Sequence, residues 1–286
     1  MTEYKWDFKR SAFVGGTLSM VALFMIENYS LESEKQVISS EKITPDFDGF
    51  RIVHLSDLHC RSFGHKNRRL IRKIKKIKPD LVVMTGDMVS RQDRNFEPFL
   101  NLARGIAREF PTYYTIGNHE LDLTDRQLSI LFSELRGAGV QVLNNDRVII
   151  TRGRSAIDLY GMWYALNFYK KNGSYRRHDP FTVGDMRRLI GDAPSRRRFS
   201  IVMAHNPLDF AVYSEWGADL VLSGHVHGGG VRLGKLGGVF SPGRKFFPEY
   251  YQGRYSLGNT DMVVSRGLGG LRLFNRPQIV EIELRR

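Results

Sequence analysis

Five short apolar runs, each ending in a cluster of polar residues, constrain the fold of this chain more than any other feature. Runs of this length, bounded by turn-forming residues, are typical of buried β-strands. Such strands occur in layered α/β proteins, where their ends meet along one rim of the sheet. We therefore expect the polar clusters to lie together in one concave site. The runs are Ile52–Leu55, Leu81–Met84, Thr112–Ile116, Phe199–Met203 and Leu220–Leu222.

The polar clusters consist mainly of residues that bind metal ions. A mixed set of carboxylate, amide and imidazole ligands suits manganese, iron or zinc, and the lack of cysteine ligands disfavours a closed structural zinc site. A single aspartate or histidine at a strand end is usually a cap or a solvated residue, but five such clusters in order are hard to explain in that way. The candidate site residues are Asp57, His59, Asp87, Asn118, His119, His205, His225 and His227.

Two divalent ions held by these side chains would suit phosphate-ester hydrolysis. Such a pair generates a hydroxide between the ions and stabilises charge on the attacking and leaving oxygens. The carboxylates of Asp57 and Asp87 would leave the centre with net positive charge, which attracts a phosphate. The two-residue spacing of Asp57 and His59, and of His225 and His227, directs each pair to one side if the extended backbone continues past the strand.

The motif order resembles that of the calcineurin-like metallophosphoesterases. The motifs are DxH, GDxxxR (Gly86–Arg91), GNHE, a histidine in His-Asn-Pro, and GHxHGG, and the resemblance spans about residues 50–284. The chain is most similar to a membrane-associated bacterial branch that includes YkuE, YaeI and the UDP-2,3-diacylglucosamine hydrolases. The resemblance implies a four-layer αββα sandwich with two divalent metal ions as cofactors.

The same resemblance implies a role for each site residue. Asp87 would bridge the two metals, and His119 would not bind metal but protonate the leaving oxygen, which is general acid catalysis. One metal would be held by Asp57, His59, Asp87 and His227, and the other by Asp87, Asn118, His205 and His225. Weaker candidates for substrate contact, chosen only for their nearness to the motifs or to a loop, are Arg61, Arg91 and Tyr164.

The N-terminal region predicts a hydrophobic helix. Ser11–Ile26 is uncharged and mostly apolar, and basic residues precede it. An uncleaved membrane anchor over residues 1–26 is the favoured interpretation, with a cleaved export signal and a buried domain helix as alternatives. Residues 27–48 are predicted to form a polar connector, and residues 49–286 one phosphoesterase domain. The expected location is the bacterial cell membrane, or alternatively the cell envelope after export.

The remaining sequence indicates an α/β domain with an anionic partner. Helix-like segments at 66–78, 96–109 and 124–137 alternate with the strands, and residues 167–198 form a basic, aromatic insertion that is a candidate lid. With 43 Lys and Arg against 30 Asp and Glu, the formal charge is +13, which favours an anionic surface such as a membrane. No nucleic-acid-binding module is recognised.

These observations predict a hydrolase that cleaves a phosphomonoester, phosphodiester or pyrophosphate bond. The substrate is expected to be a phosphorylated small molecule or a lipid- or envelope-linked compound. Two alternatives remain at this point: a metal-dependent nuclease that uses the same metal ligands, and a non-catalytic scaffold that keeps the fold without activity. Neither the substrate nor the oligomeric state follows from the sequence.

Overall fold

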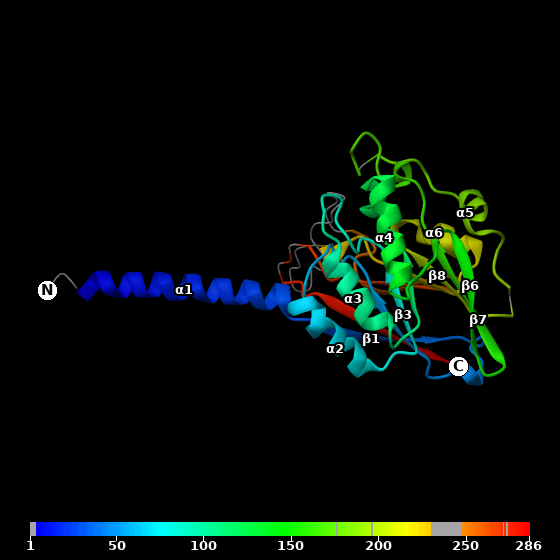
Figure 1. The fold of residues 1–286 in the computed structure, drawn as a ribbon, viewed down its shortest axis with the longest axis horizontal. Coiled ribbons are helices and arrows are strands. Elements are labelled where there is room, and N and C mark those ends of the chain that lie inside the picture. Colours follow the sequence, from blue (N-terminus) through cyan, green and yellow to red (C-terminus); the bar gives the residue numbers. More distant parts are fainter. Residues whose placement is uncertain (1–3, 176, 196, 230–247, 271, 273) are drawn as a thin grey trace.

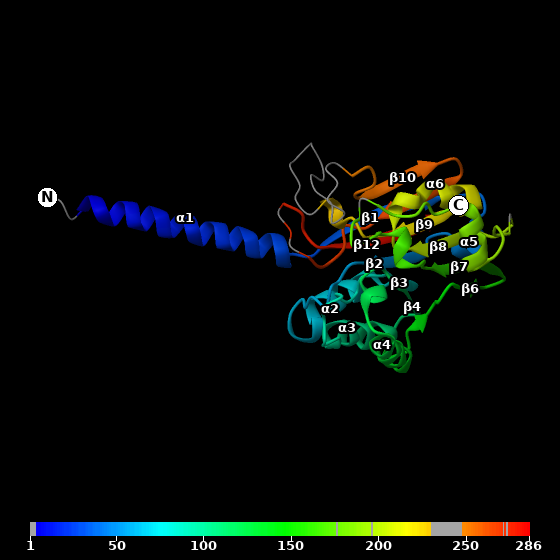
Figure 2. The same ribbon diagram turned by 90° about the horizontal axis from the view of Figure 1, so that it is seen from above.

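The computed structural model describes residues 4–286 apart from 176, 196, 230–247, 271 and 273. Helix α1 (Tyr4–Tyr29) projects from a layered body that contains two β-sheets (Figure 1). Seen from above, the two sheets face each other, with α2, α3 and α4 on one outer side and α5 and α6 on the other (Figure 2). The predicted mixed α/β sandwich is confirmed.

Each sheet has six strands. The first is ordered β1 (Glu32–Ser39), β12 (Gln278–Arg285), β2 (Arg51–Leu55), β3 (Leu81–Thr85), β4 (Thr112–Thr115), β5 (Gln141–Val142). The second is ordered β10 (Gly253–Leu257), β11 (Thr260–Val264), β9 (Leu220–Ser223), β8 (Ser200–Ala204), β7 (Ser155–Met162), β6 (Asp146–Arg152). In the first sheet β2, β3 and β4 are parallel, and in the second β7, β8 and β9 are parallel, so their carboxyl ends meet at one rim of each sheet.

Three hydrophobic clusters separate the layers. One lies between the first sheet and α2, α3 and α4, a second lies between the two sheets, and a third lies between the second sheet and α5 and α6. The helices are α2 (Arg68–Ile77), α3 (Glu97–Ala107), α4 (Asp125–Gly137), α5 (Val183–Ile190) and α6 (Phe210–Trp216). The 3-10 helices are η1 (Pro45–Phe47), η2 (His65–Asn67), η3 (Glu120–Asp122), η4 (Leu166–Phe168), η5 (Pro207–Asp209) and η6 (His227–Gly229).

The central strands are mostly apolar because both of their faces are buried, and polar side chains within them, such as His54 in β2, are buried as well. In β2, Ile52 points between the sheets and Val53 points toward the helices, as the two-residue period of a strand requires. In β3, Val83 points between the sheets and Val82 points toward the helices. Because no side of these strands meets water, their sequence shows no polar alternation, and all five predicted runs are strands.

Strand β1 lies inside residues 27–48, for which the sequence predicted only a polar connector. It pairs in parallel with β12 along its whole length, from Glu32 opposite Gln278 to Ser39 opposite Arg285. Most of its side chains are partly or fully exposed, and only Ile38 is buried. An edge strand with so little buried surface lacks the apolar signature of the central strands, so it resembles a connector in sequence.

Helix α1 covers the predicted apolar segment, and several of its large side chains are exposed, among them Phe13 (77%) and Met20 (74%). The predicted anchor is not supported as a spanning helix, because none of the helices in the described part of the chain is both long and apolar enough to cross a bilayer. At its C-terminal end α1 joins the body, where Asn28 forms two hydrogen bonds with the backbone of Arg272, at 3.0 and 3.2 Å.

Candidate metal centre

The candidate ligands follow the carboxyl ends of five strands in the two sheets. Asp57 and His59 follow β2, Asp87 follows β3, Asn118 and His119 follow β4, His205 follows β8, and His225 and His227 follow β9. Their ligand atoms form three overlapping groups, in each of which all atoms lie within 4.8 Å of one another. The groups are Asp57, His59 and His227; His59, Asp87 and His119; and Asp87, His205 and His225.

Asp87 lies at the centre of the site. Its Oδ2 atom is 3.2 Å from His205 Nε2 and 3.9 Å from His119 Nε2, and its Oδ1 atom accepts a hydrogen bond from the His119 backbone amide at 2.7 Å. It is the carboxylate common to two of the three groups. This position matches the one that a bridging ligand requires, and the bridging role itself stays a prediction.

Asp57 is the centre of the second half of the site. Its Oδ1 atom lies 3.4 Å from His227 Nε2, and both of its oxygens accept from the His225 backbone amide at 3.1 Å. The Nε2 atoms of His59 and His227 are 3.1 Å apart on stacked rings. Two imidazole nitrogens so close to a buried carboxylate form an arrangement that a cation would stabilise.

The backbone that carries the ligands is not extended. Asp57, His59, Asp87, His225 and His227 all have φ between 47° and 70°, in the left-handed region. The strand alternation proposed from the two-residue spacings is therefore wrong for both pairs: each pair converges through tight left-handed turns after its strand has ended. Such conformations cost about 1–3 kcal/mol each and persist only where the surroundings enforce them.

Two glycines allow the carboxylates to approach the neighbouring backbone. A Cβ atom on Gly117 would lie 2.4 Å from Asp87 Oδ1, and a Cβ atom on Gly224 would lie 2.3 Å from Asp57 Oδ2. Neither distance is tolerable for a carbon atom. The glycines of the GNHE and GHxHGG motifs are thus required by close packing against the candidate ligands.

Two buried polar atoms indicate that the residues fit a metal. Among the residues that the structure describes, His205 Nε2 and Asn118 Oδ1 are buried and accept no hydrogen bond. His205 Nδ1 lies 2.6 Å from the carbonyl oxygen of Thr85, to which it donates, so in the neutral ring that a metal would bind the Nε2 atom presents a lone pair to the site. Buried polar atoms without partners are rare, and metal coordination would satisfy both.

The pKa values show how strongly these groups interact. Burial opposes ionisation of His205, but the carboxylates of Asp87 and Asp57 raise its pKa to about 10. Burial and the neighbouring His205 lower the pKa of His225 to about 3. Burial also acts against ionisation of Asp87, yet His205 and His119 hold its pKa well below the usual range. The carboxylates therefore favour positive charge in the site, which divalent ions would supply.

Glu120, to which the sequence analysis gave no role, holds the loops of the site together. It is fully buried. Its Oε2 atom accepts from the amides of Asp87 and Gly117 at 2.9 and 2.8 Å, and its Oε1 atom accepts from those of Met88 and Val89 at 2.7 and 3.2 Å. One carboxylate thereby connects the loops after β3 and β4. Its position in the GNHE motif is the sequence feature that could have identified it.

His119 lies against Arg91 at the more exposed side of the site. Both ring nitrogens face Arg91: Nδ1 lies 3.2 Å from its backbone amide, Nε2 faces its guanidinium, and a neutral ring accepts at only one of the two. The Arg91 Nη2 atom is 3.0 Å from that Nε2 atom and donates to the hydroxyl of Tyr175 at 2.7 Å. Arg91 therefore lies in the site, as a substrate contact must. Tyr175 comes from the inserted loop, and nothing in its sequence context distinguished it.

The other two candidates for substrate contact differ from Arg91. Tyr164 is 2% exposed, packs against Phe181, and donates its hydroxyl to Asp209 at 2.5 Å. It is a core residue of the second sheet, so the prediction that it contacts substrate is contradicted by its burial. The guanidinium carbon of Arg61 lies 4.6 Å from the centroid of the Tyr29 ring, and Arg61 donates to the carbonyl of Gly270. Arg61 therefore lies beside the C-terminal end of α1.

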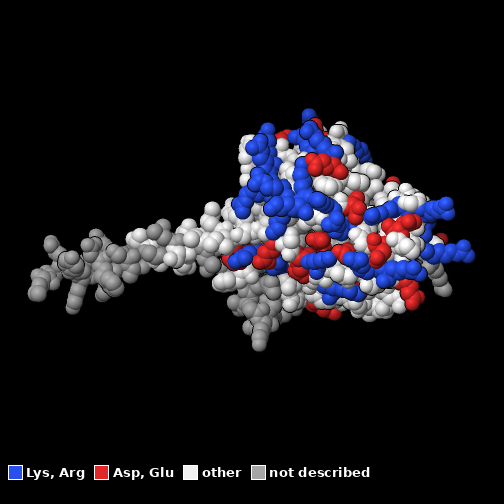
Figure 3. All heavy atoms as spheres, turned by 90° about the horizontal axis from the view of Figure 1, so that it is seen from below, with Lys and Arg blue, Asp and Glu red and all other residues white. Residues whose placement is uncertain are grey.

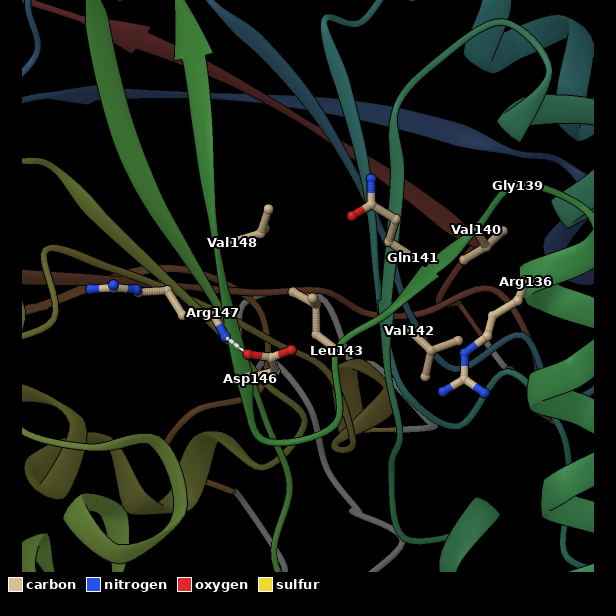
Figure 4. Close-up of a pocket in the computed structure, with 9 residues that line it drawn as sticks. All are labelled: Arg136, Gly139, Val140, Gln141, Val142, Leu143, Asp146, Arg147 and Val148. Carbon is tan, nitrogen blue, oxygen red and sulfur yellow. Dashed lines mark hydrogen bonds between the residues drawn. The ribbon is translucent and has the colours of Figure 1, made fainter.

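A separate hollow of about 500 Å³ lies at the edge of the two sheets, between the end of α4 and the start of β6 (Figure 4). Arg136, Val142 and Asp146 are among the residues that line it, and Asp146 Oδ1 accepts from the Arg147 amide at 2.7 Å. It contains none of the metal-binding groups found among the described residues. Those groups lie instead at the rim where the strands β2, β3, β4, β8 and β9 end.

Comparison with known proteins agrees with this geometry. Residues 50–229 match the calcineurin-like phosphoesterase family. The chain is 28% identical to the metallophosphoesterase YkuE of Bacillus subtilis, over 91% of this chain and 87% of YkuE. It is 28% identical to the phosphodiesterase YaeI of Escherichia coli, over 82% of each chain.

Two further similarities are more distant. The UDP-2,3-diacylglucosamine pyrophosphatase LpxG of Chlamydia muridarum is 24% identical, over 81% of this chain and 82% of LpxG. The NAD nucleotidase NadN of Haemophilus influenzae superposes with a TM-score of 0.50 at 15% identity, over 77% of this chain and 45% of NadN. The likeness to NadN concerns the fold alone.

Proposed function

Because the chain belongs to the calcineurin-like phosphoesterase family, we propose that its eight clustered side chains form a two-metal site that hydrolyses phosphate esters. Metal-dependent phosphoester hydrolysis is the chemistry of the family. The observation that supports this site is the overlap of three groups of ligand atoms around Asp57 and Asp87. Two divalent ions such as manganese, iron or zinc, when bound, would supply positive charge for the phosphoryl oxygens and activate a water molecule.

Residues of the chain would bridge the ions, protonate the leaving oxygen and orient the phosphate. Asp87, with His205 on one side and His119 on the other, is in the position to be shared by both ions. His119 would donate a proton to the leaving oxygen from Nε2, the ring nitrogen that lies 3.9 Å from Asp87 Oδ2. The Arg91 guanidinium would orient the phosphate from the same side.

The test is to measure metal content and hydrolysis on the same samples. The purified chain, loaded with manganese, should contain two ions and cleave p-nitrophenyl phosphate or its bis ester. Asp87→Asn should lose both ions and turnover, whereas Asp146→Asn, a change at the separate hollow, should behave as wild type. Wild-type protein that holds two ions and cleaves none of the esters would favour the non-catalytic scaffold, and preferential cleavage of single-stranded DNA would favour the nuclease.

We further propose that the substrate is attached to a lipid or an envelope component and that the chain contacts an anionic membrane surface. Several large apolar side chains on α1 are exposed, and the adjacent helix α2 has the sequence RRLIRKIKKI. Lys and Arg gather on the body beside the C-terminal end of α1 (Figure 3). The name of LpxG, a pyrophosphatase of a diacylated sugar nucleotide, is consistent with a lipid-linked substrate.

Vesicle flotation tests the membrane contact. The full chain should float with phosphatidylglycerol vesicles and much less with phosphatidylcholine vesicles, because basic residues contribute about 1 kcal/mol each near an anionic surface. Deleting residues 1–26 should abolish flotation and leave hydrolysis intact, since the deletion spares Asn28 and β1. Full-length protein that floats with neither kind of vesicle would contradict the membrane contact but not the proposed metal centre.

A further inference from the structure

The loop between β7 and α5 brings two aromatic rings to the metal centre. The ring centroid of Tyr169 lies 5.5 Å from that of His225, and the centroid of Tyr175 lies 6.1 Å from it. Tyr169 is buried, whereas Tyr175 is partly exposed. Of the two rings, Tyr175 is therefore the one that solvent and a substrate can reach.

The hydroxyl of Tyr175 lies where Arg91 and Asn118 meet. Arg91 Nη2 donates to the phenol oxygen at 2.7 Å, and Asn118 Nδ2 donates to it at 3.0 Å. A phenol oxygen has two lone pairs and one proton, so two donated hydrogen bonds occupy its acceptor capacity and turn its proton away from both donors. Over the described ranges of the chain, we find no acceptor for that proton.

The charges around this hydroxyl favour an anion. Arg91 pairs with Asp122 at 3.0 Å, and Lys170 pairs with the same carboxylate at 2.7 Å. Two cations facing one carboxylate leave one net positive charge beside the site. Lys170 Nζ lies 5.8 Å from the centroid of the Tyr175 ring, so this charge is close to that ring.

We propose that Tyr175 and Arg91 form an oxyanion subsite on the loop side of the metal centre. There the Tyr175 hydroxyl donates its proton in a hydrogen bond to a non-bridging oxygen of the substrate phosphate, while the Arg91 guanidinium contributes charge. The subsite takes a tetrahedral phosphate oxyanion and rests on the proposed phosphoesterase function. Asn118 connects it to the metal centre, because the same amide that orients the Tyr175 hydroxyl carries the oxygen proposed as a metal ligand.

The experiment measures binding of inorganic phosphate to the manganese-loaded full chain by titration calorimetry. Tyr175→Phe should weaken phosphate binding by about tenfold or more, since a hydrogen bond to a charged group is lost. The metal content should remain at the wild-type value. The matched control is Tyr255→Phe on β10, which removes a partly exposed hydroxyl that accepts from the Tyr251 amide at 3.2 Å. This control should bind phosphate as wild type does.

The outcomes separate this inference from the proposed function. Tyr175→Phe that binds phosphate as tightly as wild type would overturn the subsite, with the metal centre unaffected. Loss of manganese from Tyr175→Phe would also overturn it, because the tyrosine would then support Asn118 and not the substrate. If wild-type protein with two ions neither binds phosphate nor cleaves esters, the proposed function itself fails and the subsite fails with it.

Discussion

Replacing Glu120 by glutamine tests whether one buried carboxylate holds the metal-binding loops in place. Each of its oxygens accepts two backbone amides. In Glu120→Gln, one oxygen becomes an NH₂ group, so two buried amides lose their acceptor and face a donor. At about 1–3 kcal/mol for each buried donor left without a partner, the free energy of unfolding should fall by about 2–6 kcal/mol. That is a large part of a typical total of about 5–15 kcal/mol.

The assay is urea unfolding of the metal-free chain in chelator, followed by metal content after reloading with manganese. Burial and the neighbouring Asp87 raise the pKa of Glu120 to about 7. The comparison is therefore made at about pH 8.5, where the carboxylate is ionised. Because two of the four amides belong to Asp87 and Gly117, the variant should also retain fewer than two ions per chain.

The control for this prediction is Glu134→Gln on α4, where an exposed carboxylate pairs with Arg104 at 2.8 Å. Exposed ion pairs contribute about 0–1 kcal/mol, so this variant should unfold close to wild type. If Glu120→Gln unfolds within about 0.5 kcal/mol of wild type and binds two ions, the carboxylate does not organise the site, and the left-handed backbone of the ligands must be held by other contacts.

Three further changes have defined outcomes. His119→Asn should slow cleavage of alkyl phosphates by about 10²–10⁴-fold but that of p-nitrophenyl phosphate far less, because an activated leaving group needs little protonation; equal losses would remove the acid role. Asn28→Ala should lower the free energy of unfolding in urea by about 1–3 kcal/mol through loss of its hydrogen bonds to Arg272, whereas Asn101→Ala, at a partly exposed position on α3, should not. Burial raises the pKa of Asp209 to about 6, against 3.8 in the unfolded chain. The free energy of unfolding of the wild type therefore falls as the pH rises above about 3.8, and it stops falling above about pH 6. The stability of Asp209→Asn relative to wild type should therefore increase by about 2 kcal/mol between pH 4 and pH 8, and a constant difference would contradict this linkage.

The sequence predicted the central strands and the ligands for one physical reason. Strands such as β3 are buried on both faces, so they are apolar throughout, and polar residues stand out where they end. Strand β1 could not be recognised in this way because the edge of the sheet leaves its side chains exposed. The same limit applies to backbone conformation: the left-handed turns at Asp57 and His225 depend on contacts between loops that are distant in sequence.

Two of the tyrosines that follow β7 show where sequence reasoning stops. Tyr164 and Tyr175 both lie between the GNHE and His-Asn-Pro motifs, and local sequence does not distinguish them. In the structure the Tyr164 hydroxyl donates to the partly buried Asp209, while Tyr175 accepts from the candidate metal ligand Asn118. Which ring turns toward the site depends on how the insertion packs on α5 and α6, and this packing is a tertiary property.

The arrangement separates the residues that determine the reaction from those that contact the rest of the substrate. The candidate ligands are fixed by strand ends, close-packed glycines and Glu120, so little of that framework can change without displacing the carboxylates. Tyr175 and Lys170 lie instead on an insertion whose length and sequence are free of those restraints. If the subsite is correct, exchanging this loop with that of a relative should change substrate preference and leave the metal content unchanged. Loss of the ions on such an exchange would show that the insertion is part of the metal centre itself.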